Sequence, residues 1–199
     1  MDHPTSTFDL LTRFQNGERS AFSLLFHKYQ RRLAVLTYYK MSADLRGHVE
    51  VDDILQEVFF AASGSLKGFT YHSPGSLMAW LSRIADNAII DAARHQNREK
   101  RNPEELLPFR SESNPHGAEP VDLDTPSRIF ARQENVVMLL RKLDALPDDY
   151  RKVILLAKFE GLSTSEIAER IGKSREGAAL LLHRALKRIR ELEQAEEAK

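Results

Sequence analysis

Hydrophobic residues recur every three to four positions over most of the chain, a spacing typical of amphipathic α-helices. The clearest example lies at 163–190, where Ser163 and Glu166 form a Ser-x-x-Glu pair that predicts a helix N-terminus. Gly172 is expected to end this helix in the left-handed conformation, and Ser174 to cap a second, longer helix. Two helices joined by a short turn with glycine are typical of a helix-turn-helix motif. An antiparallel helix pair with a charged, solvated rim is the alternative.

The second helix of this motif has two distinct faces at about 100° per residue. The side expected to be buried consists of Ala178, Leu181, Leu182, Ala185, Ile189 and Leu192. The opposite side carries Glu176, Leu180, His183, Arg184 and Lys187. In a helix-turn-helix this outward face enters the DNA major groove, and its first residues contact base edges. Lys and Arg outnumber acidic residues from Gly161 to Arg190, which favours phosphate contacts.

The first half of the chain also predicts helices. A short helix is expected at 9–14, interrupted by Gly17, and a longer one begins at Ser20. The hydrophobic positions of the longer helix are Phe22, Leu25, Phe26, Tyr29, Leu33 and Leu36. The segment 41–50 is expected to be a connection, because it contains Gly47 and mixed polar residues.

A helix predicted over 51–62 has one buried stripe and one acidic face. The stripe consists of Val51, Ile54, Leu55, Val58, Phe59 and Ala62. The acidic face carries Asp52, Asp53, Gln56, Glu57 and Phe60. A large aromatic residue among carboxylates indicates either a partner-binding surface or a single exposed phenylalanine. A metal site is disfavoured, because adjacent Asp side chains point about 100° apart on a helix and no histidine accompanies them.

A loop rich in Gly, Ser and Pro is predicted at 67–76, and Ser76 is expected to cap a helix over 77–98. The loop carries Lys67, Phe69 and Tyr71. The core side of the helix consists of Leu77, Leu81, Ile84, Ala85, Ala88, Ile89 and Ala92. Its other side carries Trp80, Arg83, Asn87, Arg94, Arg98 and Arg101, with Asp91 at the border. Arginines that bind phosphates, beside aromatic rings that stack on bases, suit single-stranded or melted nucleic acid. An ordinary charged helix face is the alternative.

An irregular, acidic linker is predicted at 102–135, where prolines interrupt any helix and acidic residues outnumber arginines. Helical spacing resumes around Ser127. Another helix is expected to start at Leu146-Pro147-Asp148-Asp149 and to end at Gly161. The tail after Arg190 is expected to fray. The predicted fold is therefore all-α, with two small helical domains at 8–101 and 136–192.

Composition limits the functional classes. Lys and Arg total 29 and Asp and Glu total 29, so the net charge gives no indication for or against nucleic acid. The absence of cysteine excludes disulfides and Cys-based metal sites and is consistent with a cytoplasmic protein. No apolar run approaches the roughly 18 residues of a membrane span, and the first residues lack the features of a signal peptide. We expect no cofactor, metal ion, membrane partner or small-molecule substrate.

Three segments resemble bacterial sigma factors. Residues 52–59, Asp-Asp-Ile-Leu-Gln-Glu-Val-Phe, are similar to the D-D-(I/L)-x-Q-E-V-F core of sigma region 2. Residues 80–94 resemble the W-L-x-x-I-A-x-N-x-x-x-D-x-x-R pattern of the promoter-melting helix, and 143–190 is similar to region 4. The order of these motifs resembles that of the small extracytoplasmic-function (ECF) sigma factors.

The resemblance implies a dissociable specificity subunit of bacterial RNA polymerase with no catalytic chemistry. In this family the D-D-x-x-Q-E helix docks on the polymerase β′ clamp helices, which implies contacts by Asp52, Asp53, Gln56, Glu57 and Phe60. The next loop captures a flipped base of the −10 element, and the following helix holds the separated strand. The corresponding residues are Lys67, Phe69, Tyr71, Trp80, Arg83, Asn87, Arg94 and Arg98.

Region 4 of the family reads the −35 element as duplex DNA. The residues implied here are Ser174, Arg175, Glu176, Leu180, His183, Arg184 and Lys187. The family linker threads through the polymerase cleft and RNA exit path, where an acidic chain can mimic nucleic acid. The β flap of polymerase and an anti-sigma factor are further candidate partners, and the free protein is expected to be a monomer.

One departure affects the second domain. Family members commonly have Lys-Ser-Arg within the recognition helix, where this chain has Ala179-Leu180-Leu181. Leu180 is expected to contact either a thymine methyl group or a protein. Affinity for the −35 element would then rest on the start of the helix and on Arg184 and Lys187, so the family consensus is not expected to transfer.

Two other functions fit parts of the sequence. A free-standing helix-turn-helix regulator with a sensing N-terminal domain would usually form a dimer on a palindromic site. A metal-dependent enzyme using Asp52, Asp53 and Glu57 lacks a nucleophile, a histidine partner and a phosphate-binding glycine loop.

Overall fold

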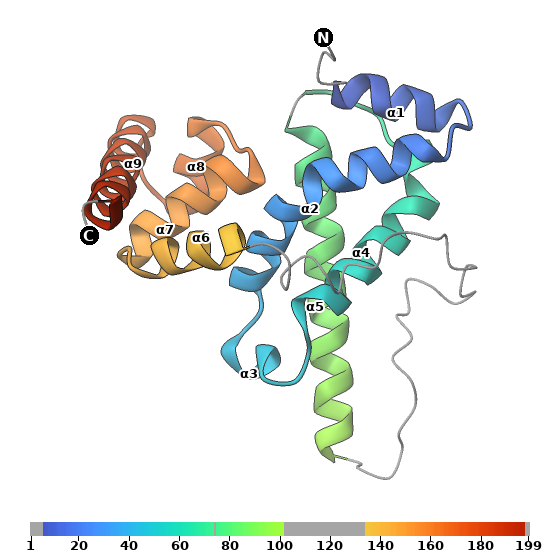
Figure 1. The fold of residues 1–199 in the computed structure, drawn as a ribbon, viewed down its shortest axis with the longest axis horizontal. Coiled ribbons are helices and arrows are strands. Elements are labelled where there is room, and N and C mark those ends of the chain that lie inside the picture. The colour runs from blue at the N-terminus through green and yellow to red at the C-terminus, as the bar shows by residue number, and fades with distance from the viewer. Residues whose placement is uncertain (1–5, 74, 102–133, 198–199) are drawn as a thin grey trace. The chain divides into compact units, whose positions relative to one another are not determined.

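The computed structural model describes residues 6–73, 75–101 and 134–197, and every regular element within them is a helix (Figure 1). The chain divides into two compact units, unit 1 (residues 1–129) and unit 2 (residues 130–199). The prediction of an all-α fold with two small helical domains is confirmed for the described residues. The predicted linker at 102–135 lies outside them, apart from Glu134 and Asn135, which are helical. The predicted domain boundaries, 8–101 and 136–192, remain predictions.

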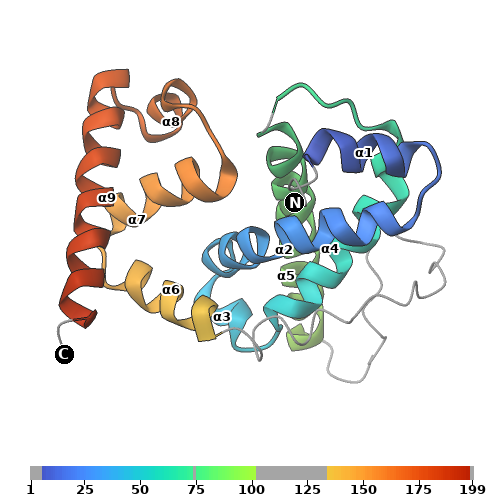
Figure 2. The ribbon, with the colours of Figure 1, turned by 45° about the horizontal axis from the view of Figure 1, so that its top comes forward.

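Unit 1 is built around one central helix, the second of the chain. Its elements are α1 (Thr7–Gln15), α2 (Ser20–Lys40), α3 (Ala43–Arg46), α4 (Val51–Ser65), the 3₁₀ turn η1 (Leu66–Gly68) and α5 (Ser76–Arg101). Helix α2 contacts α1, α4 and α5, and α4 packs along α5 (Figures 1 and 2). All six hydrophobic positions predicted for α2 are buried.

The start of unit 1 reverses direction between α1 and α2. Ser6 and Asp9 form a capping box at the start of α1. Gly17 adopts φ 99°, a conformation that favours glycine, and allows the chain to turn back from α1 into α2. Arg13 and Glu18 form an ion pair across this turn. Hydrogen bonds from Arg13 and Ser20 lower the pKa of Glu18 to about 2.

Two local predictions for unit 1 were wrong. The segment 41–50 contains α3, because Ser42 Oγ accepts a hydrogen bond from Leu45 N at 3.2 Å and the Leu45 side chain is buried. Helix α5 begins at Ser76 itself, so Ser76 is not its cap. Instead, Ser76 Oγ donates to Ser73 O at 2.7 Å and accepts from His72 N and Ser73 N at 3.3 Å, which holds the loop before the helix.

The buried surface of α5 is wider than a single helical stripe. Five of the seven predicted core residues are buried, while Ile84 and Ile89 are partly exposed. Met78 and Ser82 are buried although no pattern predicted it. Met78 and Ser82 are four residues apart and lie together at one edge of the predicted stripe, on the buried side of α5 that contacts α2 and α4. Ser82 Oγ accepts a hydrogen bond from Lys40 Nζ of α2 at 2.8 Å.

Unit 2 is arranged around its last helix. Its elements are α6 (Glu134–Asp144), α7 (Asp148–Ile154), the π-helix η3 (Leu155–Glu160), α8 (Thr164–Ile171) and α9 (Arg175–Glu197). Helix α9 contacts α6, α7 and α8. The π-helix was not predicted, although Gly161 ends it in the left-handed conformation as expected. Within the described residues, no helix has the length and apolar character to cross a bilayer.

Two further details of unit 2 differ from the prediction. Pro147 precedes α7 as its cap residue rather than lying in its first turn, and Ser127, where helical spacing was expected to resume, lies outside the described residues. The tail after Arg190 does not fray but stays helical to Glu197. An ion pair at 3.6 Å between Lys142 of α6 and Glu193 helps to hold this end of α9.

The helix-turn-helix forms from local signals, as predicted. Ser163 and Glu166 form the capping box of α8, with Glu166 Oε2 accepting a hydrogen bond from Ser163 N at 2.7 Å. Hydrogen bonds from the Ser163 hydroxyl and from its backbone N–H lower the pKa of Glu166. Gly172 ends α8 in the left-handed conformation at φ 65°, and Ser174 Oγ accepts a hydrogen bond from Gly177 N at 3.0 Å at the start of α9.

Replacing Gly172 by alanine should lower the free energy of unfolding by about 1 kcal/mol, because a side chain is strained at positive φ. Gly64→Ala is the matched control, since a Cβ at either glycine would meet no atom within 4 Å and only Gly172 has a positive φ. The control lies within α4 and should raise stability by about 0.5 kcal/mol. Urea unfolding followed by circular dichroism measures both, and equal effects at the two sites would contradict the conformational explanation.

Candidate protein- and nucleic-acid-binding surfaces

The acidic face of α4 is only partly in contact with solvent. Asp53 and Gln56 are exposed, whereas Asp52, Glu57 and Phe60 are half-buried. The large exposed aromatic residue expected at Phe60 is therefore partly covered. The five residues still share the side of α4 opposite its buried stripe, so the face predicted from periodicity exists as a surface.

Two carboxylates on this face are poorly solvated. Oδ1 of Asp52 is buried and has no hydrogen-bond partner among the described residues. Burial, together with the neighbouring carboxylates of Asp53 and Glu50, raises the pKa of Asp52 to about 6. Burial also raises the pKa of Glu57. A partly buried carboxylate is destabilised unless a cation or a hydrogen-bond donor pairs with it, so this face suits a cationic partner.

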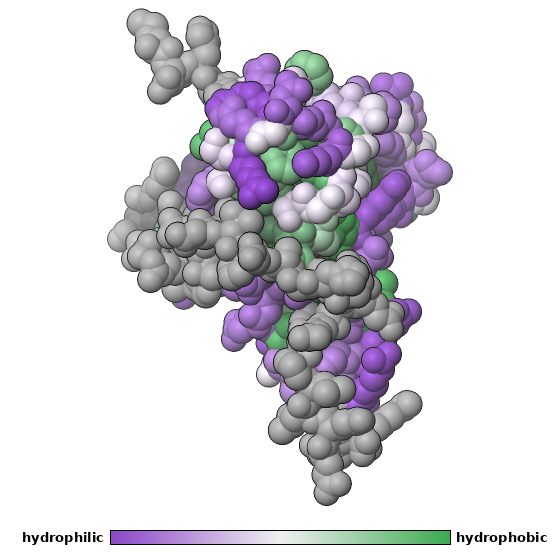
Figure 3. All heavy atoms as spheres, turned by 90° about the vertical axis from the view of Figure 1, so that its right-hand side faces the viewer, coloured by the Kyte–Doolittle hydropathy of each residue, from purple (hydrophilic) through white to green (hydrophobic). Residues whose placement is uncertain are grey.

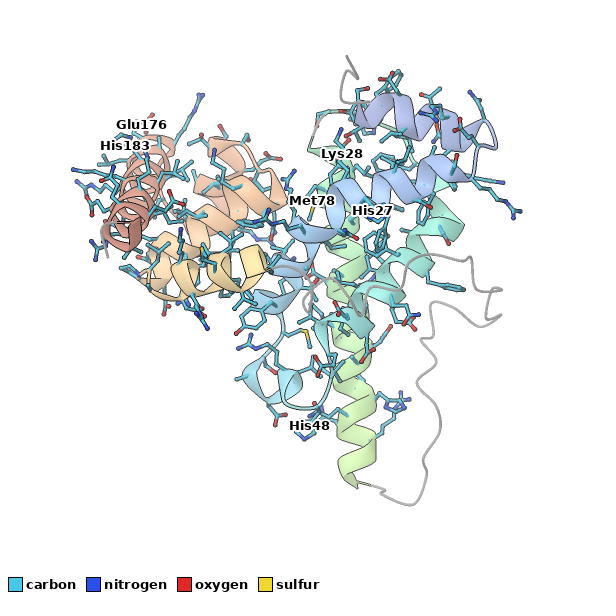
Figure 4. The ribbon with its side chains drawn as sticks, viewed as in Figure 1. His27, Lys28, His48, Met78, Glu176 and His183 are labelled. Atoms are coloured by element: carbon cyan, nitrogen blue, oxygen red, sulfur yellow. The ribbon has the colours of Figure 1, made fainter. Side chains whose placement is uncertain are left out.

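A hollow of about 400 Å³ adjoins the acidic face, between α4, the turn before it and α5. Its lining residues are His48, Val49, Asp53, Ile54, Gln56, Glu57, Ala92, His95 and Gln96. His48 lies in the turn before α4 (Figure 4). The contribution of α5 was missed from the sequence, because helical periodicity does not show which helix lies alongside. Across the described residues, no group of three His, Asp or Glu side chains is arranged to hold a metal ion.

The loop between α4 and α5, residues 69–75 with Pro74 outside the described residues, carries the predicted aromatic residues. The ring centroid of Phe69 lies 5.1 Å from that of Trp80, so the structure brings these two residues together. The ring centroid of Tyr71 lies 5.7 Å from that of Phe8 of α1, a residue for which no role was predicted. Phe69, Tyr71 and Trp80 are half-buried, whereas Lys67 is exposed.

Most of the visible described surface in Figure 3 is hydrophilic, with smaller hydrophobic areas. The large hydrophobic residues exposed among the described residues of unit 1 are Phe8, Leu24 and Ile90. Phe8 is the most exposed of them, at 55%. Since it lies against Tyr71, it extends the aromatic surface of the loop onto α1.

The predicted basic stripe of α5 is exposed. Arg83, Asn87, Arg94 and Arg98 all lie on the surface. Arg94 pairs with Asp91 at 3.4 Å, and such exposed pairs contribute little, so its guanidinium can exchange this partner for a phosphate. The stripe starts one turn after Trp80 and is therefore continuous with the aromatic residues of the loop.

The predicted DNA-reading face of α9 is also exposed. All seven of its residues, from Ser174 to Lys187, are solvent-accessible, and Leu180 is 50% exposed. Glu176 and His183 mark this face in Figure 4. On the opposite side Ala178 and Ala185 are fully buried. Arg184 and Lys187 therefore provide positive charge around an exposed leucine.

Replacing Asp52 by asparagine should stabilise the protein at pH 7.5 by up to about 1 kcal/mol, after discounting the shift for partial exposure. The pKa of Asp52 is raised in the folded state to about 6. The penalty for ionising it is therefore complete above pH 6, decreases as the pH falls through 6, and is lost below about pH 4. Urea unfolding at pH 7.5 and pH 4.5 should show a smaller gain at the lower pH.

Asp53→Asn is the control for this measurement, because Asp53 is exposed on the same turn of α4. Its effect should stay within about 0.5 kcal/mol at both pH values. A destabilising effect of Asp52→Asn at pH 7.5, or a gain that is independent of pH, would contradict a desolvated carboxylate at position 52.

Both halves of the chain match known protein families. Residues 25–99 match the family described as Sigma-70 region 2, and residues 137–189 match Sigma-70, region 4. A solved structure described as "Structure of CnrH in complex with the cytosolic domain of CnrY" is 23% identical and covers 94% of this chain and 96% of that chain. Its TM-score is 0.42.

Two curated relatives are more similar in sequence. The ECF RNA polymerase sigma-E factor of Haemophilus influenzae is 33% identical over 161 residues, which is 80% of this chain and 80% of the relative. The sigma-E factor of Escherichia coli K12 is 31% identical over 160 residues, which is 80% of this chain and 79% of the relative. Because both sigma regions match and these relatives are more than 30% identical over 80% of the chain, this chain belongs to the ECF RNA polymerase sigma factor family.

Proposed function

We propose that this chain is a dissociable subunit that directs bacterial RNA polymerase to a set of promoters, in the cytoplasm and without catalytic chemistry of its own. The observation that carries the proposal is the placement of an acidic face on α4 and basic faces on α5 and α9, across two helical units. Membership in the ECF sigma factor family supports the same assignment. Residues 8–101 are the proposed region 2, and residues 136–192 the proposed region 4.

The acidic face of α4 is the proposed contact with the β′ clamp helices of polymerase. The half-buried carboxylates of Asp52 and Glu57 would be stabilised by a Lys or Arg side chain of the partner. Asp53 and Gln56 are exposed and line the adjoining hollow, so they can bind the same partner directly. Phe60, half-buried beside them, adds apolar contact area.

The α4–α5 loop and the stripe of α5 are the proposed −10 site. Phe69, Tyr71 and Trp80 offer aromatic planes for an unstacked base, and Lys67 adds a nearby charge. Arg83, Asn87, Arg94 and Arg98 would hold the phosphates of the separated strand. The aromatic contact between Phe69 and Trp80 supports this assignment, because it joins the loop to the start of the basic stripe.

The exposed face of α9 is the proposed contact with the −35 duplex. Ser174, Arg175 and Glu176 lie at the start of the helix, where base edges are read. Arg184 and Lys187 add phosphate or guanine contacts further along. Leu180 is 50% exposed on this face, so a thymine methyl group or a protein surface can cover it.

The remaining partners follow from the family resemblance. They are the β flap, reached through unit 2, and an anti-sigma factor; the acidic segment 102–135 is proposed to pass through the polymerase cleft. A free-standing helix-turn-helix regulator is not favoured, because the relatives are sigma factors over 80% of the chain.

Transcription in vitro tests the function directly. Core polymerase with the wild-type protein should initiate at discrete start sites on genomic fragments, whereas core polymerase alone should not. Asp53→Lys combined with Glu57→Lys should abolish both co-purification with core polymerase and initiation, because two attractive charges become repulsive. Absence of selective initiation by the wild-type protein would contradict the function, and unchanged co-purification of the variant would contradict the docking face.

A second variant in unit 1 is the matched comparison. Arg83→Ala with Arg94→Ala should leave co-purification unchanged and lower promoter opening, measured by permanganate reactivity of the −10 region, by about tenfold or more. Its binding to closed duplex should fall less. Equal losses of opening and duplex binding would place these arginines outside the −10 site.

Arg184→Ala should weaken binding to the −35 element by about 1–3 kcal/mol if its guanidinium is bidentate to guanine, and by less if it contacts only phosphate. Arg188→Ala is a suitable control, because Arg188 lies on the same helix and pairs with Glu191 at 3.1 Å. Gel-shift titration of the polymerase complex at two salt concentrations distinguishes the two contacts. Identical effects of both variants would argue against base readout by Arg184.

A further inference from the structure

Helix α1 forms hydrogen bonds with the segment that follows α4, although the sequence pattern predicted no function for α1. Nε2 of Gln15, the last residue of α1, lies within hydrogen-bond distance of three main-chain oxygens. It donates to Phe69 O at 2.8 Å and is shared with Leu66 O and Lys67 O at 3.3 Å. A single carboxamide thus binds the carbonyl groups of the turn η1 and the first loop residue.

The turn η1 is followed by extended chain, and carbonyls at a helical end generally depend on donors from outside the helix. Leu66 O also accepts a hydrogen bond from Phe69 N at 3.1 Å, which closes the turn. Gln15 adds donors to Lys67 O and Phe69 O from an element more than 50 residues earlier in the sequence. The hydrogen bonds therefore fix the direction in which the main chain continues from η1 into the loop.

The same helix contacts the loop again near its other end. Phe8 lies in the first turn of α1, and its ring centroid is 5.7 Å from that of Tyr71. The chain from η1 to Tyr71 therefore runs beside α1, from the end of that helix towards its start (Figures 1 and 2). On the side of α5, Trp80 contacts Phe69, and Ser76 holds His72 and Ser73.

Helix α1 is itself firmly held. Leu10, Leu11 and Phe14 are buried, and the ring centroid of Phe14 lies 5.4 Å from that of Phe22 in α2. An element packed in this way can fix a loop, whereas an exposed, unpacked helix would move with it. A loop ordered before DNA arrives does not lose that conformational freedom on binding, which favours the bound state.

We propose that Gln15 is a positioning residue for promoter opening: from α1 it holds residues 66–73 in the conformation that captures an unstacked base of the −10 strand, with Phe8 as the second support. The inference rests on the proposed function of this loop. Gln15 does not need to touch DNA, because it acts through the main chain of Leu66, Lys67 and Phe69.

The test uses Gln15→Met, which keeps the length of the side chain and removes both donors. Thr12→Ala is the matched control, because Thr12 is exposed on α1 and its hydroxyl bonds only to Phe8 O of the same helix, at 2.9 Å. Gln15→Lys restores a donor at the same place. Gln15 is exposed, so all three variants should fold, which circular dichroism checks.

The first measurement needs neither DNA nor polymerase. Trp80 is the only tryptophan of the chain, and its ring is covered in part by Phe69. Quenching of its fluorescence by neutral acrylamide should increase in Gln15→Met, remain unchanged in Thr12→Ala and return towards the wild-type level in Gln15→Lys. Equal quenching in Gln15→Met and the wild-type protein would overturn the inference.

The second measurement is the rate of promoter opening by the polymerase complex. Gln15→Met should lower this rate about tenfold, as expected for the loss of a few hydrogen bonds. Co-purification with core polymerase should be unchanged, and Gln15→Lys should recover part of the rate. Increased quenching with an unchanged opening rate would overturn the role in capture. If the wild-type protein opens no promoter, the proposed function fails and the capture role fails with it, even where quenching shows that Gln15 holds the loop.

Discussion

The burial of one run of α2, Leu33–Thr37, on all sides is the constraint on which unit 1 depends. The run Leu33–Thr37 is almost completely inaccessible to solvent, so no face of this part of α2 can bind a partner. A helix of this kind is stable only when other helices cover it, and α1, α4 and α5 do so. The outward faces of these three helices are then left on the surface, where the proposed contacts with polymerase and DNA lie. The separation of the acidic face of α4 from the basic stripe of α5 follows from this arrangement.

The acidic face of α4 reduces stability in the free protein. Asp52 and Glu57 lie where burial opposes ionisation, and Asp52 Oδ1 has no hydrogen-bond partner among the described residues. Groups retained against stability are characteristic of binding and catalytic sites, where a partner supplies the missing interaction. A cationic side chain docked against this face would lower the pKa of both carboxylates and remove the penalty on binding.

Local signals in the sequence were sufficient for the helix-turn-helix and insufficient for the contacts between helices. Ser163, Gly172 and Ser174 act through their own backbone neighbours, so their roles were predicted correctly. The contact of Gln15 with Phe69, in contrast, joins segments more than 50 residues apart, and helical periodicity does not show such a contact. The face of α4 was predicted as a set of residues, but its hollow required the position of α5.

The exposed leucine of α9 is compatible with promoter selection because, on the proposed function, the two units bind one DNA molecule. Leu180 lies at the centre of the proposed reading face, so the proposed duplex contacts are those of Arg184, Lys187 and the start of the helix. When unit 1 is docked on polymerase at a promoter, unit 2 binds its element in an effectively intramolecular step. A modest contact is then sufficient for selection, since tethering supplies the local concentration. On the proposed function, a weak intrinsic affinity would also keep the free protein from occupying promoters without polymerase.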